Sequence, residues 1–379
     1  GKGSLPYDHP QSVGALGATG TAAADALAAE ADVVIGVGTR YSDFTTASRT
    51  VFAAEDVRFV NINVSAFDAH KQSAVSVVAD AREALTALRT RLEGWSAPAE
   101  HTARATGLAQ DWDTVVERAY TAPEGSASEG RLVQSQVIGV VNRTTSPRDV
   151  VVCAAGSMPG DLHKLWRTRD RKGYHVEYGF SCMGYEVAGG LGVKLAALDE
   201  SEATGAEDRD VVVMVGDGSW LMMSSEIVTA VAEGVKVIVV LVQNHGFASI
   251  GSLSESLGSQ RFGTRYRRRT PTGLDGDLLP VDLAANAASL GADVVVARTL
   301  RELEAGVRAA KGSARTTVIH VETDPLVSAP DSPAWWDVPV AEVSALGSTR
   351  RARADYEQHK THQRTYLAPA DPGAAPPPR

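Results

Sequence analysis

The sequence has little of what marks secreted, membrane-embedded or nucleic-acid-binding proteins. Only two of its 379 residues are cysteines, Cys153 and Cys182, which is too few for a disulfide framework or a thiolate metal cluster. No apolar run reaches the ~18 residues that span a bilayer, and no stretch has the pattern of a signal peptide. Acidic residues outnumber basic ones by 46 to 37, and the net charge of −9 argues against binding to nucleic acid. We therefore expect a cytoplasmic protein with neither nucleic acid nor membrane among its partners.

What the sequence does contain is a regular alternation of apolar runs and helical patterns, long enough for two domains. We predict a partial α/β central domain over residues 1–93 and a linker over 94–130. A doubly wound parallel-sheet domain that binds a diphosphate follows over 131–326. The remaining residues, 327–379, form a tail with a polar helix and a Pro/Ala-rich end. The first residues, Gly1-Lys2-Gly3, read as though the chain were entered in the middle of a domain.

In the first domain a buried strand runs into the pair Gly36 and Gly38, which invites a dinucleotide-binding interpretation. A third glycine and an immediately following helix are missing, and the acidic pair Glu55-Asp56 precedes the next strand instead of ending it. A tight turn in a structural domain is the simpler interpretation, and nucleotide binding stays an alternative.

The second domain is organised around residues 211–250. The apolar run Val211–Val215 predicts a buried strand, and Gly216-Asp217-Gly218 turns the chain into a helix that Ser219 could cap. A second apolar run, 236–242, leads into Asn244-His245-Gly246. In such a βαβ unit both polar turns lie at the carboxyl ends of parallel strands, where open α/β sheets bind ligands. An acidic stretch, 199–210, is predicted to be a solvated loop.

The residue types at these turns suit a magnesium ion. Asp217 offers a carboxylate, Asn244 an amide oxygen, and the glycine at 246 lets a main-chain carbonyl approach as a third oxygen. Mg²⁺ takes oxygen ligands in near-octahedral geometry and often completes its shell with phosphate oxygens and water. The glycines beside Asp217 leave backbone N–H groups open to a diphosphate.

A GDG turn followed at this spacing by an asparagine resembles the diphosphate-anchoring motif of the thiamine diphosphate enzymes. The resemblance implies Mg²⁺ and thiamine diphosphate as cofactors, with Asp217, Asn244 and the Gly246 carbonyl as metal ligands. Gln243 stands where many relatives carry a second asparagine. The segment YGFSCMGYEVAGGLG resembles a second family stretch and places Met183 beneath the bend of the cofactor, while Glu186 replaces an apolar residue there.

Several further residues complete the predicted site. Gly156 and Ser157 follow the strand at 149–154, where small residues let a diphosphate or substrate approach. His245 is the candidate for moving a proton, and Phe247, Ser249 and Ile250 are expected to line a loop over the diphosphate. The predicted cofactor contacts are Gly156, Ser157, Met183, Gly216, Asp217, Gly218, Ser219, Asn244, Gly246 and Phe247. The arginine-rich stretch 265–269 is interpreted as a solvated loop or a subunit contact, with a lid over an anionic substrate as the alternative.

The family resemblance also implies a glutamate that activates the cofactor and lies on a separate N-terminal domain, which no stretch of this chain resembles. It further implies self-association as a homodimer or tetramer, because two subunits share each cofactor. The segment 1–93 resembles the family's central domain, which holds FAD in the acetohydroxyacid synthase branch.

Longer stretches, among them AAGSMPGDLHKLWRTRDRKGYHVEYGFSCMGYE and PAWWDVPVAEVSALGSTR, are similar to the ring-opening hydrolases of myo-inositol breakdown. That similarity implies a cyclic 1,2-dione, 3D-(3,5/4)-trihydroxycyclohexane-1,2-dione, as the substrate and hydrolysis of a C–C bond as the reaction. Two alternatives stay open: a carboligase or decarboxylase of the acetohydroxyacid synthase type, and a cofactor-binding fragment without activity.

Overall fold

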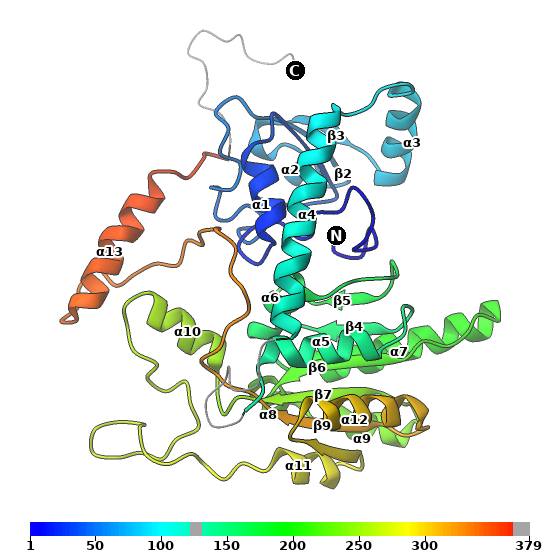
Figure 1. Cartoon of the computed structure of the whole chain (residues 1–379), viewed down its shortest axis with the longest axis vertical. Helices are drawn as coiled ribbons and strands as arrows, with labels where there is room; N and C mark the ends of the chain where they lie inside the picture. The colour runs from blue at the N-terminus through cyan, green and yellow to red at the C-terminus, as the bar shows by residue number, and fades with distance from the viewer. Residues whose placement is uncertain (122–130, 367–379) are drawn as a thin grey trace. The chain divides into compact units, whose positions relative to one another are not determined.

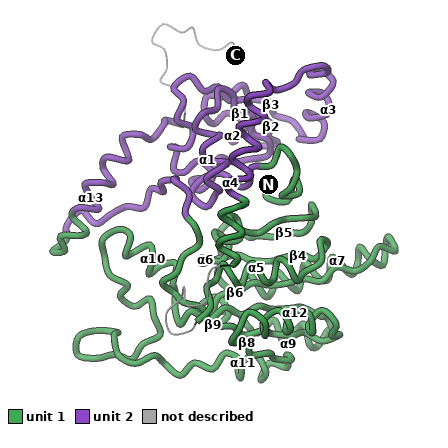
Figure 2. Tube along the Cα trace, in the orientation of Figure 1, with its two compact units in different colours: residues 1–12, 113–330, 344–350 green, residues 13–112, 331–343, 351–379 purple. Residues whose placement is uncertain are grey.

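The computed structural model describes residues 1–121 and 131–366. Within these ranges the chain forms two compact units, which Figure 2 shows in different colours. One consists of residues 1–12, 113–330 and 344–350, and the other of residues 13–112, 331–343 and 351 onward. The two predicted segments that fall on residues 122–130 and 367–379, the end of the linker and the Pro/Ala-rich end, lie outside the described residues.

The larger unit is built on a six-stranded parallel sheet, and this confirms the predicted fold class (Figure 1). The strand order is β5-β4-β6-β7-β9-β8. The strands are β4 (Val150–Cys153), β5 (Tyr174–Val176), β6 (Val211–Gly216), β7 (Ile238–Gln243), β8 (Asp293–Ala297) and β9 (Thr317–Glu322).

Helices cover both faces of this sheet. They are α5 (Gln134–Thr144), α6 (Ser157–Leu165), α7 (Tyr185–Thr204), α8 (Asp217–Met223), α9 (Glu226–Ala232), α11 (Leu283–Ser289) and α12 (Leu300–Gly312). A further helix, α10 (Ala248–Ser256), follows the turn after β7. Val318 of β9 joins the core formed with α7, α8, α9 and α11, whereas the next residue, Ile319, lies against Gly306 of α12. Successive side chains of a strand point to opposite faces, so α12 covers the other side of the sheet.

The central strands are apolar on both faces because both faces are covered. Every residue of β7 is buried, as are Val211 to Val215 of β6. Parallel sheets buried on both sides require such continuous apolar runs instead of alternating ones. Across residues 1–121 and 131–366, none of the helices combines the length and the apolar character needed to cross a membrane.

The smaller unit contains a three-stranded parallel sheet in the order β1-β2-β3: β1 (Val33–Val37), β2 (Arg58–Asn63) and β3 (Val75–Val78). Its short helices are α1 (Ala22–Ala29), α2 (Ala66–Ala69) and α3 (Ala81–Arg91). The helices α4 (Ala99–Tyr120) and α13 (Gly347–Lys360) each contain residues of both units. In the tail, Trp336 donates a hydrogen bond from Nε1 to Asp43 at 2.8 Å and its ring lies on Phe44.

The glycine turn after β1 is filled by side chains of its own unit. A Cβ placed on Gly36 would lie 2.2 Å from the hydroxyl of Tyr41, and that hydroxyl donates to Asn61 at 2.6 Å. Asn63 donates to the Thr39 carbonyl. The close approach that requires glycine at position 36 is therefore made by a tyrosine of the same chain, as expected for a structural turn.

Four local predictions are wrong. The stretch 199–210 is not a loop throughout, because α7 continues to Thr204 before a left-handed Gly205 ends it. The single helix predicted after the GDG turn is broken at Ser224 into α8 and α9, and α8 begins at Asp217, so Ser219 lies inside the helix and does not cap it. Residues 248–250 begin α10 and are not a loop.

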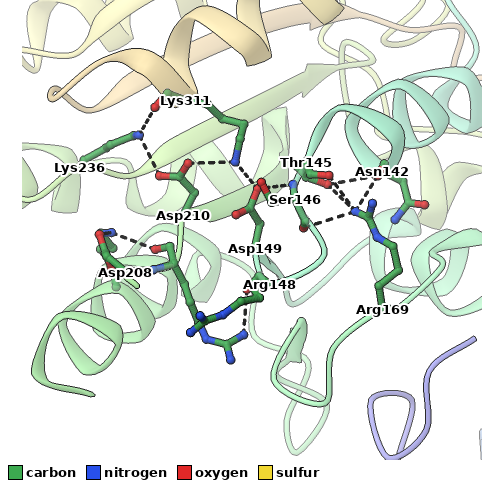
Figure 3. Close-up of polar contacts among 12 residues, drawn as sticks. Asn142, Thr145, Ser146, Arg148, Asp149, Arg169, Asp208, Asp210, Lys236 and Lys311 are labelled. Atoms are coloured by element: carbon green, nitrogen blue, oxygen red, sulfur yellow. Dashed lines mark hydrogen bonds and ion pairs between the residues drawn. The ribbon is translucent and has the colours of Figure 1, made fainter. Parts of the chain in front are cut away.

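The amino edge of the six-stranded sheet is held by an ion-pair network of Asp149, Asp210, Lys236 and Lys311 (Figure 3). Asp149 and Asp210 stand directly before β4 and β6, and Lys236 precedes β7. The Lys311 ammonium lies 3.0 Å from Asp210 and also bonds Asp149, while Lys236 lies 2.8 Å from Asp210. Lys236 donates in addition to the Lys311 carbonyl. This amino-edge network ties three strands to the end of α12.

Candidate functional site

The predicted site residues lie at the carboxyl edge of the six-stranded sheet, on either side of the point where the strand order reverses. From β4 the chain moves outward to β5 and then returns across β4 to form β6. Crevices at such switch points are where open parallel sheets bind ligands. Gly156 and Ser157 follow β4, whereas Gly216 ends β6 and Asp217 begins α8, so the two pairs flank this crevice.

Asp217 is the buried carboxylate of the site. Its side chain accepts hydrogen bonds from the backbone N–H of Gly218 at 3.0 Å and of Gly246 at 3.1 Å. Burial raises the pKa of Asp217 to about 6, although these backbone hydrogen bonds act to lower it. A charged carboxylate held away from water is stabilised by a nearby cation, so this position favours a metal ion.

The side-chain oxygen of Asn244 shows whether the site is suited to a metal ion. Its side chain is 9 % exposed, and its Oδ1 atom is buried without a hydrogen-bond partner among the described residues. Buried polar oxygens are nearly always partnered, by protein, water or an ion. A hard cation that takes carboxylate and amide oxygens would satisfy this atom, and the residues present therefore fit Mg²⁺. Within 1–121 and 131–366, no three His, Cys, Asp or Glu side chains gather as an alternative metal site.

Gly246 is fixed by a second segment, residues 264–266, which we call the strap. The strap pairs with the 245–247 turn, with Phe247 N–H donating to the Thr264 carbonyl at 2.8 Å and Tyr266 N–H to the His245 carbonyl at 2.9 Å. A Cβ on Gly246 would lie 2.2 Å from the Thr264 carbonyl oxygen, and its φ of +156° also disfavours a side chain. Glycine is therefore required here by the strap; its role as a metal ligand stays a prediction.

Met183 and Phe247 meet over the GDG turn. A Cβ placed on Gly218 would lie 2.9 Å from the Phe247 ring and 3.0 Å from the Met183 methyl group. The structure thus brings together Met183, Gly218 and Phe247, which come from three separate parts of the chain. The role of Met183 as a support beneath a bent cofactor stays a prediction. Ser219 is buried within α8.

Glu186 explains the departure from the family pattern that the sequence alone left open. This carboxylate is 1 % exposed, and it accepts hydrogen bonds from the backbone N–H of Ala155 at 3.1 Å and of Gly184 at 2.9 Å. It therefore joins the turn after β4 to the start of α7. On the same side, Ser157 accepts a hydrogen bond from Gln134, and Gly156 adopts a positive φ of 84°.

His245 lies beside the metal-binding turn, but both of its ring nitrogens are engaged. Gln243 Nε2 lies 3.1 Å from Nδ1, and Glu322 Oε2 lies 3.1 Å from Nε2. With the amide donating to Nδ1, the Nε2 proton is directed to Glu322. Gln243 Oε1 in turn accepts from His320 at 2.6 Å. Gln243 therefore bridges two histidines, which an asparagine at this position is too short to do in the same way. The proton-transfer role of His245 stays a prediction.

The other histidines near the strand ends are also held by neighbours. His175 lies 2.7 Å from the Tyr185 hydroxyl through Nε2, and burial lowers its pKa. His163 stacks against Tyr174, and burial together with nearby Lys2 lowers its pKa to about 3. Neutral imidazoles packed in this way are typical of structural histidines.

Sequence reasoning missed the strap. Tyr266 of this segment is in contact with the site through the edge of Phe247, at 5.7 Å between ring centroids. The arginines around it form part of a cavity at the same turn, of about 150 Å³, whose lining includes Arg131, Arg265 and Arg267. The sequence signal was the charge of residues 265–269, which left a lid over an anionic substrate as an alternative but did not place the stretch against residues 245–247.

Comparisons with known proteins identify the family of both domains. The model of the "Thiamine pyrophosphate enzyme, C-terminal TPP binding domain" matches residues 154–321. The "Thiamine pyrophosphate enzyme, central domain" matches residues 1–88. The first match contains the turns after β4, β6 and β7 that build the site.

Among curated proteins the chain is similar to enzymes named 3D-(3,5/4)-trihydroxycyclohexane-1,2-dione hydrolase. It is 38 % identical to that of Bacillus thuringiensis (strain Al Hakam), over 94 % of this chain and 57 % of the relative. It is also 38 % identical to that of Bacillus anthracis, over 97 % of this chain and 59 % of the relative. The chain thus spans less than two thirds of the length of these relatives. From the two matched domains and the site they contain, we conclude that the chain belongs to the thiamine pyrophosphate enzymes.

Proposed function

We propose that this chain carries the diphosphate-binding half of an enzyme that opens a cyclic 1,2-dione by hydrolysis of a C–C bond. The proposed substrate is 3D-(3,5/4)-trihydroxycyclohexane-1,2-dione, and the proposed product is 5-deoxy-glucuronic acid. Thiamine diphosphate is the cofactor of the family, and Mg²⁺ is proposed as its metal. The observation that carries the proposal is the pair formed by the Asp217 carboxylate and the buried Asn244 amide oxygen at neighbouring turns, a place that we call the corner. The chain that holds it is 38 % identical to enzymes named 3D-(3,5/4)-trihydroxycyclohexane-1,2-dione hydrolase.

Different residues of the chain would bind different parts of the cofactor. The Asp217 carboxylate and the Asn244 amide oxygen would bind the metal, with the Gly246 carbonyl as a third ligand. Backbone N–H groups exposed by the glycine turns would take phosphate oxygens. Met183 and Phe247 shield the turn from water with apolar surface. When bound, thiamine diphosphate supplies a carbanion that adds to a ketone and accepts the electrons of the bond that breaks.

Support for a hydrolase over a carboligase comes from two sources. The relatives above carry the hydrolase name. In addition, the Gly36 turn, which would have to approach a nucleotide in the acetohydroxyacid synthase branch, is filled by Tyr41. We further propose that the activating glutamate is contributed by sequence beyond the matched domains and that the protein self-associates as a homodimer or tetramer in the cytoplasm.

The test uses this chain together with whatever coding sequence precedes it, supplied with Mg²⁺ and thiamine diphosphate. Ring opening of the dione is followed by NMR beside consumption of pyruvate, with Asp217→Ala as the control. Ring opening that disappears in the control supports the proposal. Pyruvate turnover with an unchanged dione would replace it by the carboligase alternative. Binding without either activity would favour a cofactor-binding fragment.

A further inference from the structure

We propose that the hydroxyl of Tyr266 is a further contact of this site, donating a hydrogen bond to an oxygen of the bound metal–diphosphate group. The inference rests on the proposed function, because it requires that group to occupy the corner beside Asp217. It adds a residue of the strap that the family motifs do not include.

The first observation is an unsatisfied hydroxyl. The Oη atom of Tyr266 is buried and has no hydrogen-bond partner among the residues that the structure describes. A buried phenol normally finds a partner, because leaving its hydroxyl unpaired costs about 1–3 kcal/mol. Asn244 Oδ1 is unpaired in the same way at the adjoining turn. An acceptor oxygen for the tyrosine and a cation for the asparagine are both features of a metal–diphosphate group.

The second observation is where the ring lies. Tyr266 packs edge-on against Phe247, with centroids 5.7 Å apart and planes at 86°, and Phe247 itself lies on the GDG turn. Burial, and then the negative charge of Asp217, raise the pKa of Tyr266 well above its ordinary value. The phenol therefore stays protonated and can act only as a donor toward an anion, and it is near enough to Asp217 to feel its charge.

The third observation is that the backbone carrying the ring is fixed against the turn at 245–247. The backbone of the strap is held on both sides of Tyr266: its N–H donates to the His245 carbonyl at 2.9 Å, and its carbonyl accepts from Leu279 N–H at 2.8 Å. Gly246 and Arg265 form an antiparallel bridge directly beside it. A donor fixed in this way is positioned before the ligand arrives, which is how binding sites limit the entropy lost on binding.

The variant Tyr266→Phe separates this role from a structural one. Without ligand, it should raise the melting temperature by roughly 2–4 °C, because an unpaired buried hydroxyl is removed. With ligand, it should bind about tenfold more weakly, the loss expected for one hydrogen bond to a charged group. Binding is measured by calorimetry with Mg²⁺ plus thiamine diphosphate and, separately, with Mg²⁺ plus inorganic pyrophosphate, on the preparation used for the activity test.

Tyr120→Phe is the matched control. The Tyr120 hydroxyl is also buried, but it donates to the Leu165 carbonyl at 2.5 Å. This control should lower the melting temperature without ligand and leave binding of both probes unchanged. The opposite signs of the two phenylalanine variants are the signature of the proposed contact.

The outcomes distinguish the two proposals. If the wild type binds, Asp217→Ala does not, and Tyr266→Phe binds like the wild type, the Tyr266 assignment is overturned while the proposed function stands. If Tyr266→Phe loses stability as Tyr120→Phe does, the hydroxyl already has a partner and the assignment is also overturned. If the wild type binds neither probe, the proposed function is overturned and this assignment with it.

Discussion

The amino and carboxyl ends of the strands in the six-stranded sheet, its amino edge and its carboxyl edge, differ in how their charged and polar groups are paired. At the amino edge, each carboxylate of the amino-edge network faces an ammonium group of Lys236 or Lys311. At the carboxyl edge, the buried Asp217 carboxylate accepts hydrogen bonds from backbone N–H groups, and Asn244 Oδ1 and Tyr266 Oη have no hydrogen-bond partner among residues 1–121 and 131–366. The same strands thus end in a satisfied network on one side and an unsatisfied corner on the other. Polar groups left unsatisfied in a folded protein point to function more strongly than ion pairs do.

Among substitutions at the two edges, Gly246→Ala should have the largest effect on the free energy of unfolding. In Gly246→Ala the new methyl group would collide with the Thr264 carbonyl, so the strap has to move or the turn has to unfold. We expect a loss of about 3–5 kcal/mol in the free energy of unfolding, measured by urea denaturation. Gly216→Ala is the matched control, because a Cβ there meets nothing within 4 Å, and it should change stability by less than about 1 kcal/mol. Equal losses in both variants would show that the strap does not constrain the turn.

A carboxylate of the carboxyl edge should destabilise the ligand-free protein at neutral pH. The pKa of Asp217 is about 6 in the folded protein, above its ordinary value of 3.8, so the folded state holds its proton more tightly than the unfolded state. Stability from this group is therefore present at low pH and is lost as the pH rises toward 6. Asp217→Asn should gain up to about 3 kcal/mol at pH 7 and nothing near pH 3. Urea denaturation without Mg²⁺ at both pH values checks this, and a loss of stability at pH 7 would contradict it.

A carboxylate of the amino edge should behave in the reverse way. Burial alone would raise the pKa of Asp210, but hydrogen bonds from Lys236 and Lys311 outweigh it and hold the pKa below the ordinary value. The contribution of Asp210 is present above its unfolded pKa and disappears as the pH falls through the lower folded value. Asp210→Asn should therefore cost about 2 kcal/mol at pH 7 and progressively less in acid. The difference in unfolding free energy from the wild type, followed from pH 7 to pH 2, gives the result; a constant difference would mean that the charge is unimportant.

The smallest effect concerns Glu186, a buried carboxylate of the carboxyl edge that is held by backbone N–H groups. Glu186→Gln places an amide near two backbone donors that a carboxylate satisfies, and we expect a loss of about 1–2 kcal/mol. Glu177→Gln is the comparison, since this carboxylate is less buried and also accepts from two backbone N–H groups, those of Phe180 and Cys182. It should lose less than about 0.5 kcal/mol because water replaces the lost acceptor. Thermal unfolding of both variants ranks them, and the reverse order would show that burial of Glu186 is unimportant.

The sequence predicted the parts of the fold that depend on local pattern. The clearest sequence signals came from β6, β7 and the GDG turn that follows β6. The two strands are short, buried apolar runs, and glycines mark the turn. The short edge strand β5 and the half-exposed β3 were missed, because their residues lack a continuous apolar run. Helix α6 was also missed, because Gly156 and Ser157 were interpreted only as small residues that let a ligand approach; Pro159 of this helix lies in its first turn, where proline is tolerated.

The candidate site was predicted where its residues lie in one motif and missed where they meet through tertiary structure. Asp217 and Asn244 directly follow neighbouring strands, and the closeness of such strand ends can be inferred from a βαβ pattern. Tyr266 reaches the same turn from a segment without helical or strand periodicity, so nothing local indicated its place. Glu186 likewise has a meaning only once the turn after β4 is seen to lie against the start of α7.

The hydrogen-bonded chain from His320 through Gln243 to His245 provides an NMR signal that can report on ligand binding at the corner. Its members extend from the buried β9 strand to the turn that carries Asn244. The Nε2 atom of His320 lies 2.6 Å from the Gln243 amide oxygen, and a buried imidazole proton in such a short hydrogen bond exchanges slowly with solvent and resonates far from other protons in an NMR spectrum. Filling of the corner beside Asn244 should shift that resonance, so occupancy could be followed at a single atom without a label.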